Sequence, residues 1–327
     1  MRSRWRGFQS VLSIDIERFV EYKRALRRRY VSEEKALRLL DAFLIGRAVG
    51  SVDAITPDLL QQFLATRRHR RPRSYNELLG VVRRLFEWLV AQGRLERSPV
   101  RAGKRRESAK RIPYIFDTGD ASRLLDLAGR LPDKSRAPMR GPTYRTIFAL
   151  LFGLGLRVGE VSRLQRQDVD LDRDLLRIRD TKFGKDRLVP FGPRMARLVR
   201  RHLELRGNHV LAPEAPLFSF TKRGHIHPGT ISQTFHHLVP KLGLAVPSGT
   251  AAPRVHDLRH AFAVGTLLRW YREGVDPAAR LFHLATFLGH VNPSSTAVYL
   301  TITPELLAAA NRRFESFAAL AVKEVSP

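Results

Sequence analysis

Apolar residues recur at helical spacing along most of this chain, and one short stretch has the pattern of β-strands instead. Four helices are expected between residues 8 and 98. One begins at Thr56-Pro57-Asp58, where a capping hydroxyl precedes a proline and an acid. Between residues 175 and 191, two short apolar runs flank DTKFGKD, which predicts a β-hairpin or a three-stranded sheet edge. Helical spacing then resumes. The pattern therefore predicts a mainly α-helical fold with one small antiparallel β-sheet.

A basic segment that is poor in large apolar residues separates two regions of the chain. Residues 97–112 read RSPVRAGKRRESAKRI, which combines proline, glycine and many positive charges. We therefore expect a helical domain over residues 8–98, a basic linker over residues 99–112 and a second domain over residues 113–327. The length of 327 residues agrees with two domains.

The charge of the chain indicates a polyanionic partner. There are 58 Lys and Arg residues against 31 Asp and Glu, a formal net charge of +27. Such an excess favours nucleic acid, because Lys and Arg displace the counterions condensed on phosphates. A ribosome-bound or membrane-surface protein is the alternative, but no strongly amphipathic basic helix dominates the sequence. Two basic clusters are candidate DNA contacts: Arg67, Arg68, Arg70, Arg71 and Arg73 in the first domain, and Lys104, Arg105 and Arg106 in the linker.

The absence of cysteine excludes disulfides, thiolate zinc sites and cysteine nucleophiles. Four histidines, in HIHPGTISQTFHHL, have no acidic partner nearby, so we expect a DNA-facing surface there rather than a metal site. They are His225, His227, His236 and His237. No metal and no cofactor are expected. The first residues lack the apolar core of a signal peptide, and no window reaches the length of a membrane span. We expect a cytoplasmic, nucleoid-associated protein without membrane contact.

Six side chains suited to phosphate chemistry follow one another in recognisable local frames. They are Arg157 in GLGLRVGEVSRL, Lys182 in TKFGKDRLVPF, His256 and Arg259 in HDLRHAF, His290 in LGH, and Tyr299 in TAVYL. Two arginines can hold a phosphate, Lys and His groups can move protons, and a tyrosine can be the nucleophile. Each residue alone has an ordinary explanation, such as a surface arginine, a histidine at a helix start or a core tyrosine. Their conjunction, in this order, is what indicates a function.

In this order the frames resemble the tyrosine recombinase (phage integrase) family, and the likeness covers nearly the whole chain. The helical N-terminal region resembles the family's SAM-like core-binding domain, and residues from about 113 resemble its catalytic domain. The resemblance implies a two-domain clamp around double-stranded DNA. It also implies cutting and rejoining of DNA through a 3′-phosphotyrosyl intermediate, without ATP or metal. A homo-tetramer on DNA and accessory recombination proteins are the further partners that it implies.

The resemblance assigns Arg157 and Arg259 to the scissile phosphate as a clamp. His256, three residues before Arg259 and on the same face of a helix, would assist as a hydrogen-bond donor or proton carrier. Glu160 matches an acidic position that buttresses the active site, and its spacing from Arg157 allows the two side chains to pair.

The same resemblance assigns Tyr299 as the nucleophile and His290 as the residue that supports the phosphate and positions the tyrosine. The surrounding positive groups are expected to favour its phenolate. Tyr271 is a rival nucleophile that lacks the LGH frame. Lys182 would protonate the departing 5′ oxygen, and Lys185 on the same hairpin is its rival.

The spacer between Arg259 and His290 is long, and it resembles that of recombinases borne on transposon-like elements more than that of chromosome-dimer resolvers. This favours a recombinase of a mobile element, acting in integration, excision or transposition. A type IB topoisomerase and a non-catalytic DNA-binding protein are the two alternatives. The core-binding-like domain and a helix expected over residues 304–320 argue against the first, and the intact residue set argues against the second.

Overall fold

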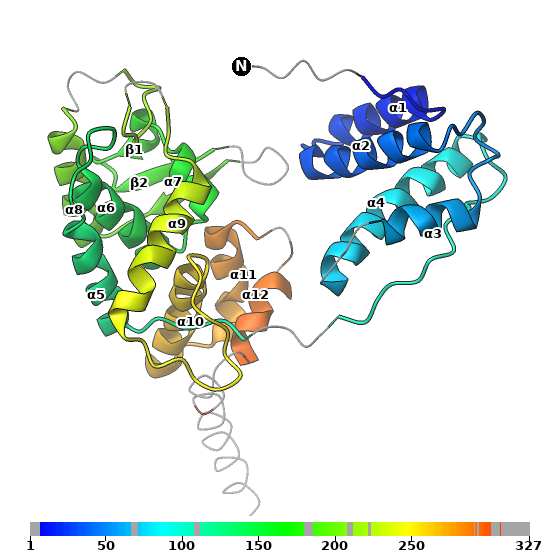
Figure 1. Ribbon diagram of the computed structural model, residues 1–327. Coiled ribbons are helices and arrows are strands. Elements are labelled where there is room, and N and C mark those ends of the chain that lie inside the picture. The colour runs from blue at the N-terminus through cyan, green and yellow to red at the C-terminus, as the bar shows by residue number, and fades with distance from the viewer. Residues whose placement is uncertain are drawn as a thin grey trace, which may run out of the picture. The chain divides into compact units, whose positions relative to one another are not determined.

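The computed structural model describes residues 7–66, 71–107, 112–179, 186–207, 212–221, 224–290, 292, 294–301 and 308. The chain divides into two compact units, residues 1–110 and 111–327, and each is described by itself (Figure 1). The described residues are mostly helical and include one three-stranded antiparallel sheet, which confirms the predicted fold class. No helix among them is long and apolar enough to cross a membrane.

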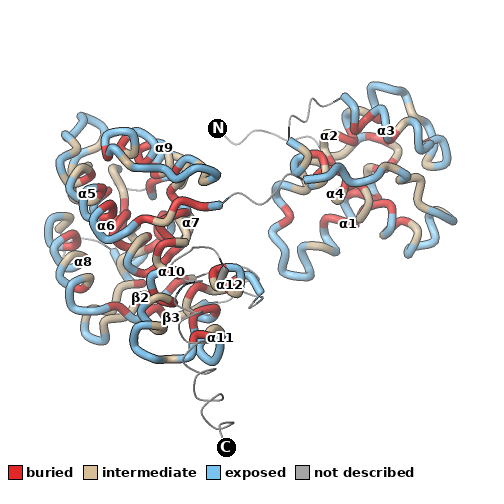
Figure 2. The backbone as a smooth tube through the Cα atoms, turned by 90° about the horizontal axis from the view of Figure 1, so that it is seen from below, coloured by how far each residue is buried: buried red, intermediate tan, exposed pale blue. Residues whose placement is uncertain are grey.

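Four helices pack around one core in the first unit. They are α1 (Ser13–Ala25), α2 (Val31–Gly46), α3 (Pro57–Ala65) and α4 (Pro72–Ala91). Their buried sides face one another (Figure 2), and the core includes Ile16, Phe19, Leu40, Phe63, Leu85 and Phe86. The apolar residues that the helical period places on one face are therefore the ones that exclude water here.

The ends of these helices follow local signals. Thr56 caps α3, because its hydroxyl accepts the backbone N–H of Leu59 at 3.2 Å. The fourth helix begins at Pro72, whose constrained φ suits a first turn. The chain leaves the same helix through Gly93, which has a φ of +68°.

Residues 99–107 form no helix or strand but lie against α4. The side chain of Asn76 accepts from the backbone N–H of Arg105 at 2.8 Å and donates to its carbonyl at 2.9 Å. The Arg105 guanidinium lies 3.9 Å from the centre of the Tyr75 ring, a cation–π contact. Arg83 also donates to the carbonyl of Ala102 at 2.7 Å. This part of the predicted linker is thus held by the first unit.

The second unit combines helices with the small sheet. Its helices are α5 (Thr118–Gly129), α6 (Arg140–Gly153), α7 (Val158–Arg163), α8 (Pro193–Leu205), α9 (Pro228–Leu238), α10 (Asp257–Arg272), α11 (Pro277–Leu288) and α12 (Ser294–Ala297). Short 3₁₀ turns lie at η1 (Arg166–Asp168), η3 (Val239–Leu242) and η4 (Val298–Thr301). Buried α6 lies at the centre and contacts α5, α8 and α10.

The sheet has the order β1 (Val169–Asp170), β2 (Leu175–Ile178) and β3 (Arg187–Pro190), all antiparallel. Leu176 pairs with Val189, and both are buried, whereas Arg177, Leu188 and Pro190 beside them are exposed. One face of the sheet therefore covers the core, as alternation predicts. β3 also contacts α11, which brings the start of that strand to the catalytic candidates.

Candidate active site

Two glycines in the left-handed conformation present main-chain carbonyls to two arginines. Gly155 has a φ of +59° and Gly289 a φ of +68°. A Cβ at Gly155 would lie 2.5 Å from the ring of Phe262, and one at Gly289 would lie 2.8 Å from Nη1 of Arg187. A side chain at either position would be strained as well as crowded. This accounts for the glycines in the GLGLR and LGH frames.

Arg259, on the first turn of α10, is 1% exposed and is the largest fully buried side chain described. Its Nη1 donates to the carbonyl of Gly155 at 2.6 Å, and its Nη2 donates to the carbonyl of Leu288 at 2.7 Å. Burial, followed by the charge of Arg157, lowers the pKa of Arg259 to about 9. The guanidinium stays charged at neutral pH and is held rigidly.

Arg157 caps α7 and is held by two contacts, while about a third of its side chain remains exposed. Nη1 donates to Oε1 of Glu160 at 2.8 Å, and Nη2 donates to the carbonyl of Gly289 at 2.9 Å. The backbone N–H of Arg157 also donates to Glu160, at 2.9 Å. The fork is therefore oriented, yet it has a surface open to a ligand.

Glu160 is 5% exposed and joins two arginines. Arg187, the first residue of β3, donates to both of its carboxylate oxygens at 2.9 Å and to the carbonyl of Phe287 at 2.9 Å. Burial would raise the pKa of Glu160, but the hydrogen bonds and charges of Arg187 and Arg157 outweigh it and lower the pKa to about 2. The carboxylate is thus the ionised bridge between α7 and β3.

We expect Glu160→Gln to destabilise the fold at neutral pH, and progressively less in acid. The folded-state pKa of about 2 lies below the ordinary value of 4.5, so the carboxylate stabilises the fold above pH 4.5. That contribution is lost as the pH falls towards 2. A pKa difference of this size corresponds to about 3 kcal/mol. Urea unfolding midpoints of both proteins at pH 7 and pH 3 measure it.

The matched control is Glu204→Gln on α8, because Glu204 is exposed. It should leave the midpoint within the experimental spread at both pH values. If the Glu160→Gln deficit stays the same from pH 7 to pH 3, the ion pair is not what stabilises this corner of the molecule.

Tyr299 lies in η4 and is 3% exposed. Its hydroxyl is joined to Nδ1 of His260 by a 2.9 Å hydrogen bond. The ring of His290 lies nearly parallel to the tyrosine ring, with centroids 6.4 Å apart. The hydroxyl that we expected to be the nucleophile therefore lies among histidines and within the electrostatic reach of Arg259 and Arg157.

The expectation that these surroundings favour the phenolate is only half right. Arg259 and Arg157 do lower the pKa of Tyr299, but burial raises it more, and the net change is upward. A buried phenol that is harder to ionise needs a partner to take its proton when it attacks. The sequence pattern indicates which charged residues lie near Tyr299, but it does not show how far the fold shields the tyrosine hydroxyl from water.

Three histidines line this part of the site, and all are neutral at pH 7. Enclosure by the protein is the largest cause that lowers the pKa of His256, His260 and His290 to about 4, and neighbouring positive groups lower it further. His256 keeps an exposed edge. His290 follows the left-handed Gly289, and its backbone N–H donates to the carbonyl of Ala285 at 2.8 Å. The ring nitrogen Nδ1 of His290 contacts the Thr296 hydroxyl at 2.6 Å.

Two residues of the site were not among the sequence candidates. Arg187 lies inside the TKFGKDRLVPF frame quoted for Lys182, but nothing in that frame separates it from the many other arginines of the chain. His260 stands directly after Arg259 and four residues after His256, so it is one helical turn from the histidine that we did single out. That spacing was the available signal, and the rings of His256 and His260 do meet, with centroids 4.8 Å apart.

Three other candidates are not seen at this site. Lys182 and Lys185 are outside the described residues, in the sequence between the end of β2 and the start of β3. Tyr271 lies near the end of α10, twelve residues after Arg259, which is about 18 Å along a helix. It packs against an apolar cluster that includes Leu267 and Leu284.

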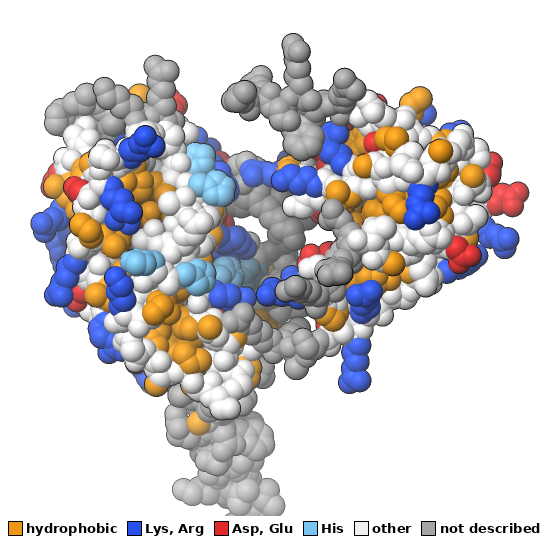
Figure 3. Space-filling view, in the orientation of Figure 1, with side chains coloured by type: hydrophobic (Ala, Val, Ile, Leu, Met, Phe, Trp, Pro, Cys, Tyr) orange, Lys and Arg blue, Asp and Glu red, His pale blue; other side chains and the backbone are white. Residues whose placement is uncertain are grey.

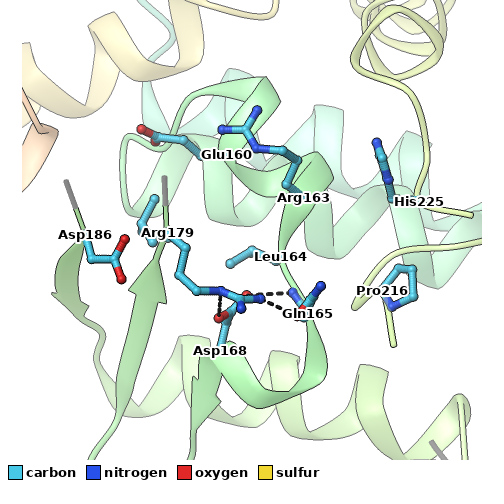
Figure 4. Close-up of a pocket in the computed structure, with 10 residues that line it drawn as sticks. Glu160, Arg163, Leu164, Gln165, Asp168, Arg179, Asp186, Pro216 and His225 are labelled. Atoms are coloured by element: carbon cyan, nitrogen blue, oxygen red, sulfur yellow. Dashed lines mark hydrogen bonds and ion pairs between the residues drawn. The ribbon is translucent and has the colours of Figure 1, made fainter. Parts of the chain in front are cut away.

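A cavity of about 520 Å³ opens between α7, the sheet and the segment that contains Pro216 and His225. Figure 4 shows Arg179 contacting Asp168, with Nε 2.7 Å from a carboxylate oxygen, and also Gln165. Glu160 is among the residues that line this cavity. The cavity therefore adjoins the ion pair that holds Arg157, and its lining includes Ile178 at the end of β2 and Asp186 just before β3.

The candidate DNA contacts differ in availability. Arg67, Arg68 and Arg70 lie outside the described residues. The five described candidates are all exposed; they are Arg71, Arg73, Lys104, Arg105 and Arg106. Arg73 also pairs with Glu77 at 3.0 Å, and Arg105 also lies over the Tyr75 ring. On the face seen in Figure 3, Lys and Arg side chains are spread over both units.

The four histidines of the HIHPGTISQTFHHL segment lie in and before α9. His227 caps this helix by accepting the N–H of Gly229 at 3.0 Å. Within the part of the chain that the structure describes, no group of three or more His, Asp or Glu residues is placed to hold a metal ion.

Sequence comparison places this site in a known family. The profile described as "Phage integrase family" matches residues 122–305, which include the described catalytic candidates. An integrase/recombinase-named protein of Sinorhizobium fredii, y4rB, is 34% identical over 303 residues, covering 92% of this chain and 96% of that protein. Tyrosine recombinase XerC of Chlorobaculum tepidum is 29% identical over 249 residues, 71% of this chain and 70% of its own.

Solved structures share the fold. The integrase of transposon Tn1549, in complex with transposon right end DNA, has a TM-score of 0.65 at 16% identity, over 95% of this chain and 100% of its own. A lambda integrase dimer bound to a COC′ core site has a TM-score of 0.57 at 19% identity, over 88% of this chain and 76% of that chain. At these identities the likeness concerns the fold alone.

Proposed function

This chain belongs to the phage integrase family of tyrosine recombinases, and we propose that it cuts and rejoins DNA at specific sites with Tyr299 as its nucleophile. The observation that carries this proposal is the arrangement around the tyrosine hydroxyl. Arg259 and Arg157, from different helices, are both held by main-chain carbonyls of the Gly155 and Gly289 turns, and both act on Tyr299. The tyrosine thus lies beside two preoriented cations that could hold a phosphate.

The reaction is an exchange of phosphodiesters. Arg157 and Arg259 hold the non-bridging oxygens of the scissile phosphate and neutralise the charge that develops there. Tyr299 attacks the phosphorus and forms a 3′-phosphotyrosyl bond, and the 5′ oxygen leaves with a proton from Lys182. Glu160 holds the fork of Arg157, and His256 and His290 donate hydrogen bonds to the phosphate. A 5′ hydroxyl of another strand then reverses the step, so the bond energy is retained.

The substrate is double-stranded DNA, with residues 8–98 as a core-binding domain, residues 113–327 as the catalytic domain and the intervening basic segment along the DNA backbone. Because recombination cuts two duplexes twice each, the active form is a tetramer of this chain on DNA. The long spacer between Arg259 and His290 supports a role in a mobile element. The chromosome in the cytoplasm is the corresponding place of action.

A library of nicked duplexes with a randomised site tests the function without knowledge of the target. The nick lets a short fragment diffuse away after cleavage and traps the covalent complex. Incubation in EDTA without ATP should give a protein–DNA adduct that survives boiling in detergent. Sequencing of the trapped DNA should return one motif, with the protein on the 3′ side. No adduct with any sequence, or an adduct on the 5′ end, would contradict the proposal.

A further inference from the structure

His260 contacts the attacking atom of the proposed reaction. Its Nδ1 lies 2.9 Å from the Tyr299 hydroxyl, and the two rings have centroids 5.4 Å apart. His260 follows Arg259 on α10, so the helix that holds the buried arginine also places this imidazole. Because the helix and η4 are in contact, the hydrogen bond is part of their packing.

The opposite nitrogen of the imidazole faces a carboxylate. Nε2 of His260 lies 4.0 Å from Oδ1 of Asp257, which has 0% exposure. Arg254 holds Asp257 by two hydrogen bonds. Its backbone N–H donates to Oδ2 of Asp257 at 2.8 Å, and its Nη2 donates to Oδ1 at 3.2 Å. A fixed carboxylate on the Nε2 side favours the proton on that nitrogen. The lone pair of Nδ1 is then free to accept the tyrosine hydroxyl proton.

The other two histidines are placed for different contacts. Nδ1 of His290 is occupied by the Thr296 hydroxyl at 2.6 Å, and its ring stacks beside Tyr299. His256 meets the edge of the His260 ring. Among the described histidines, His260 is the one hydrogen-bonded to the Tyr299 hydroxyl.

The charges around His260 and Tyr299 keep the imidazole of His260 neutral, as a base requires. Burial, followed by the charges of Arg254 and Arg259, lowers the pKa of His260 to about 4, so the ring can accept a proton throughout the neutral range. Arg259 on α10 and Arg157 at the start of α7 face Tyr299, and His290 stacks on it from the end of α11. Asp257, whose Oδ1 lies 4.0 Å from Nε2, is a negative group beside the imidazolium that would form.

We propose that His260 is the catalytic base of the cleavage step, a role that rests on the function proposed above. As Oη of Tyr299 bonds to phosphorus, its proton passes to Nδ1 of His260 while the bond from phosphorus to the 5′ oxygen breaks. The 5′ oxygen takes its proton from the separate acid, Lys182. Asp257 stabilises the imidazolium, which returns the proton to Tyr299 when the strand is rejoined.

The test is the pH dependence of cleavage in His260→Ala. The substrate is a duplex that carries the motif recovered from the nicked library, with sulfur in place of the scissile 5′ oxygen. A thiolate leaves without taking a proton, so the cleavage rate no longer depends on the acid, Lys182. Without a base, attack needs the phenolate, whose fraction rises tenfold per pH unit below its pKa. General-base assistance contributes about 100-fold or more. We expect His260→Ala to cleave about 100-fold more slowly than the wild type at pH 7 and about tenfold more slowly at pH 8.

Two further variants make the outcome decisive. His283→Ala, an exposed histidine on α11, should cleave as the wild type does. His260→Asn keeps a polar group near Nδ1 but cannot take the proton, so it should show the same pH-dependent deficit even if His260→Ala folds poorly. A deficit that is equal at every pH would show that His260 only supports the tyrosine. A pH-dependent deficit in His256→Ala, with none in His260→Ala, would assign the base to His256.

This outcome is separable from that of the proposed function. If Tyr299→Phe still forms the adduct, then the nucleophile is wrong, whatever His260 does. If Tyr299→Phe abolishes the adduct while His260→Ala cleaves at the wild-type rate at pH 7, then the function stands and the base proposal fails.

Discussion

Tyr299→Phe is expected to abolish the covalent protein–DNA adduct on a nicked substrate, with a loss of about 10⁴-fold or more, because no other group replaces a covalent nucleophile. The ring should still pack against Ala263, Leu267 and Leu284. The fold loses one hydrogen bond to His260, worth about 1 kcal/mol. DNA binding should therefore remain near that of the wild type. A denaturing gel measures the adduct, and a native gel measures binding.

Tyr271→Phe is the matched control for this experiment. Tyr271 lies near the far end of α10 and packs on the same apolar cluster. The control should form the adduct at the wild-type rate. Equal adduct from the wild type and Tyr299→Phe, or its loss in Tyr271→Phe, would overturn the assignment of the nucleophile.

Arg259→Lys should slow cleavage by about 10³-fold, the size of effect seen when one preorganised donor to a developing negative charge is removed. The guanidinium donates to the carbonyls of Gly155 and Leu288 and has further N–H groups left for a phosphate. A lysine has one nitrogen and cannot reach both carbonyls and the phosphate together. Single-turnover cleavage at saturating protein measures the chemical step apart from binding.

Arg269→Lys on the same helix serves as the control, because Arg269 is exposed. It should leave the rate unchanged. Circular dichroism and DNA binding of Arg259→Lys show whether the buried lysine is tolerated by the fold. If a folded Arg259→Lys cleaves within threefold of the wild type, Arg259 does not hold the reacting phosphate.

Much of the architecture follows from local signals in the sequence. The Thr56-Pro57-Asp58 start of α3 is visible as residue types, because caps involve neighbours within four positions. The two strands around the hairpin and the mainly helical class follow from periodicity. The Gly289 turn after α11 also has a local signal, since a glycine after an apolar helical run favours a left-handed end.

The missing parts of the site depend on contacts between distant segments. Arg187 matters because it bridges Glu160 and the carbonyl of Phe287, residues that are 27 and 100 positions away. No local pattern separates such an arginine from the many that serve only the charge of the surface. His260 was closer to recognition, one turn after His256. Its role depends on where η4 places Tyr299, 39 residues later.

The most direct measurement is the identity of the residue that carries the DNA. Trapped adduct would be digested with nuclease and trypsin, and the nucleotide-linked peptide would be sequenced by mass spectrometry. Cleavage after Arg280 and Arg312 yields residues 281–312, in which Tyr299 is the single tyrosine, whereas Tyr271 falls in residues 270–272. We predict a 3′-phosphonucleotide on Tyr299. A nucleotide on Tyr271, or on any serine or histidine, would contradict the account.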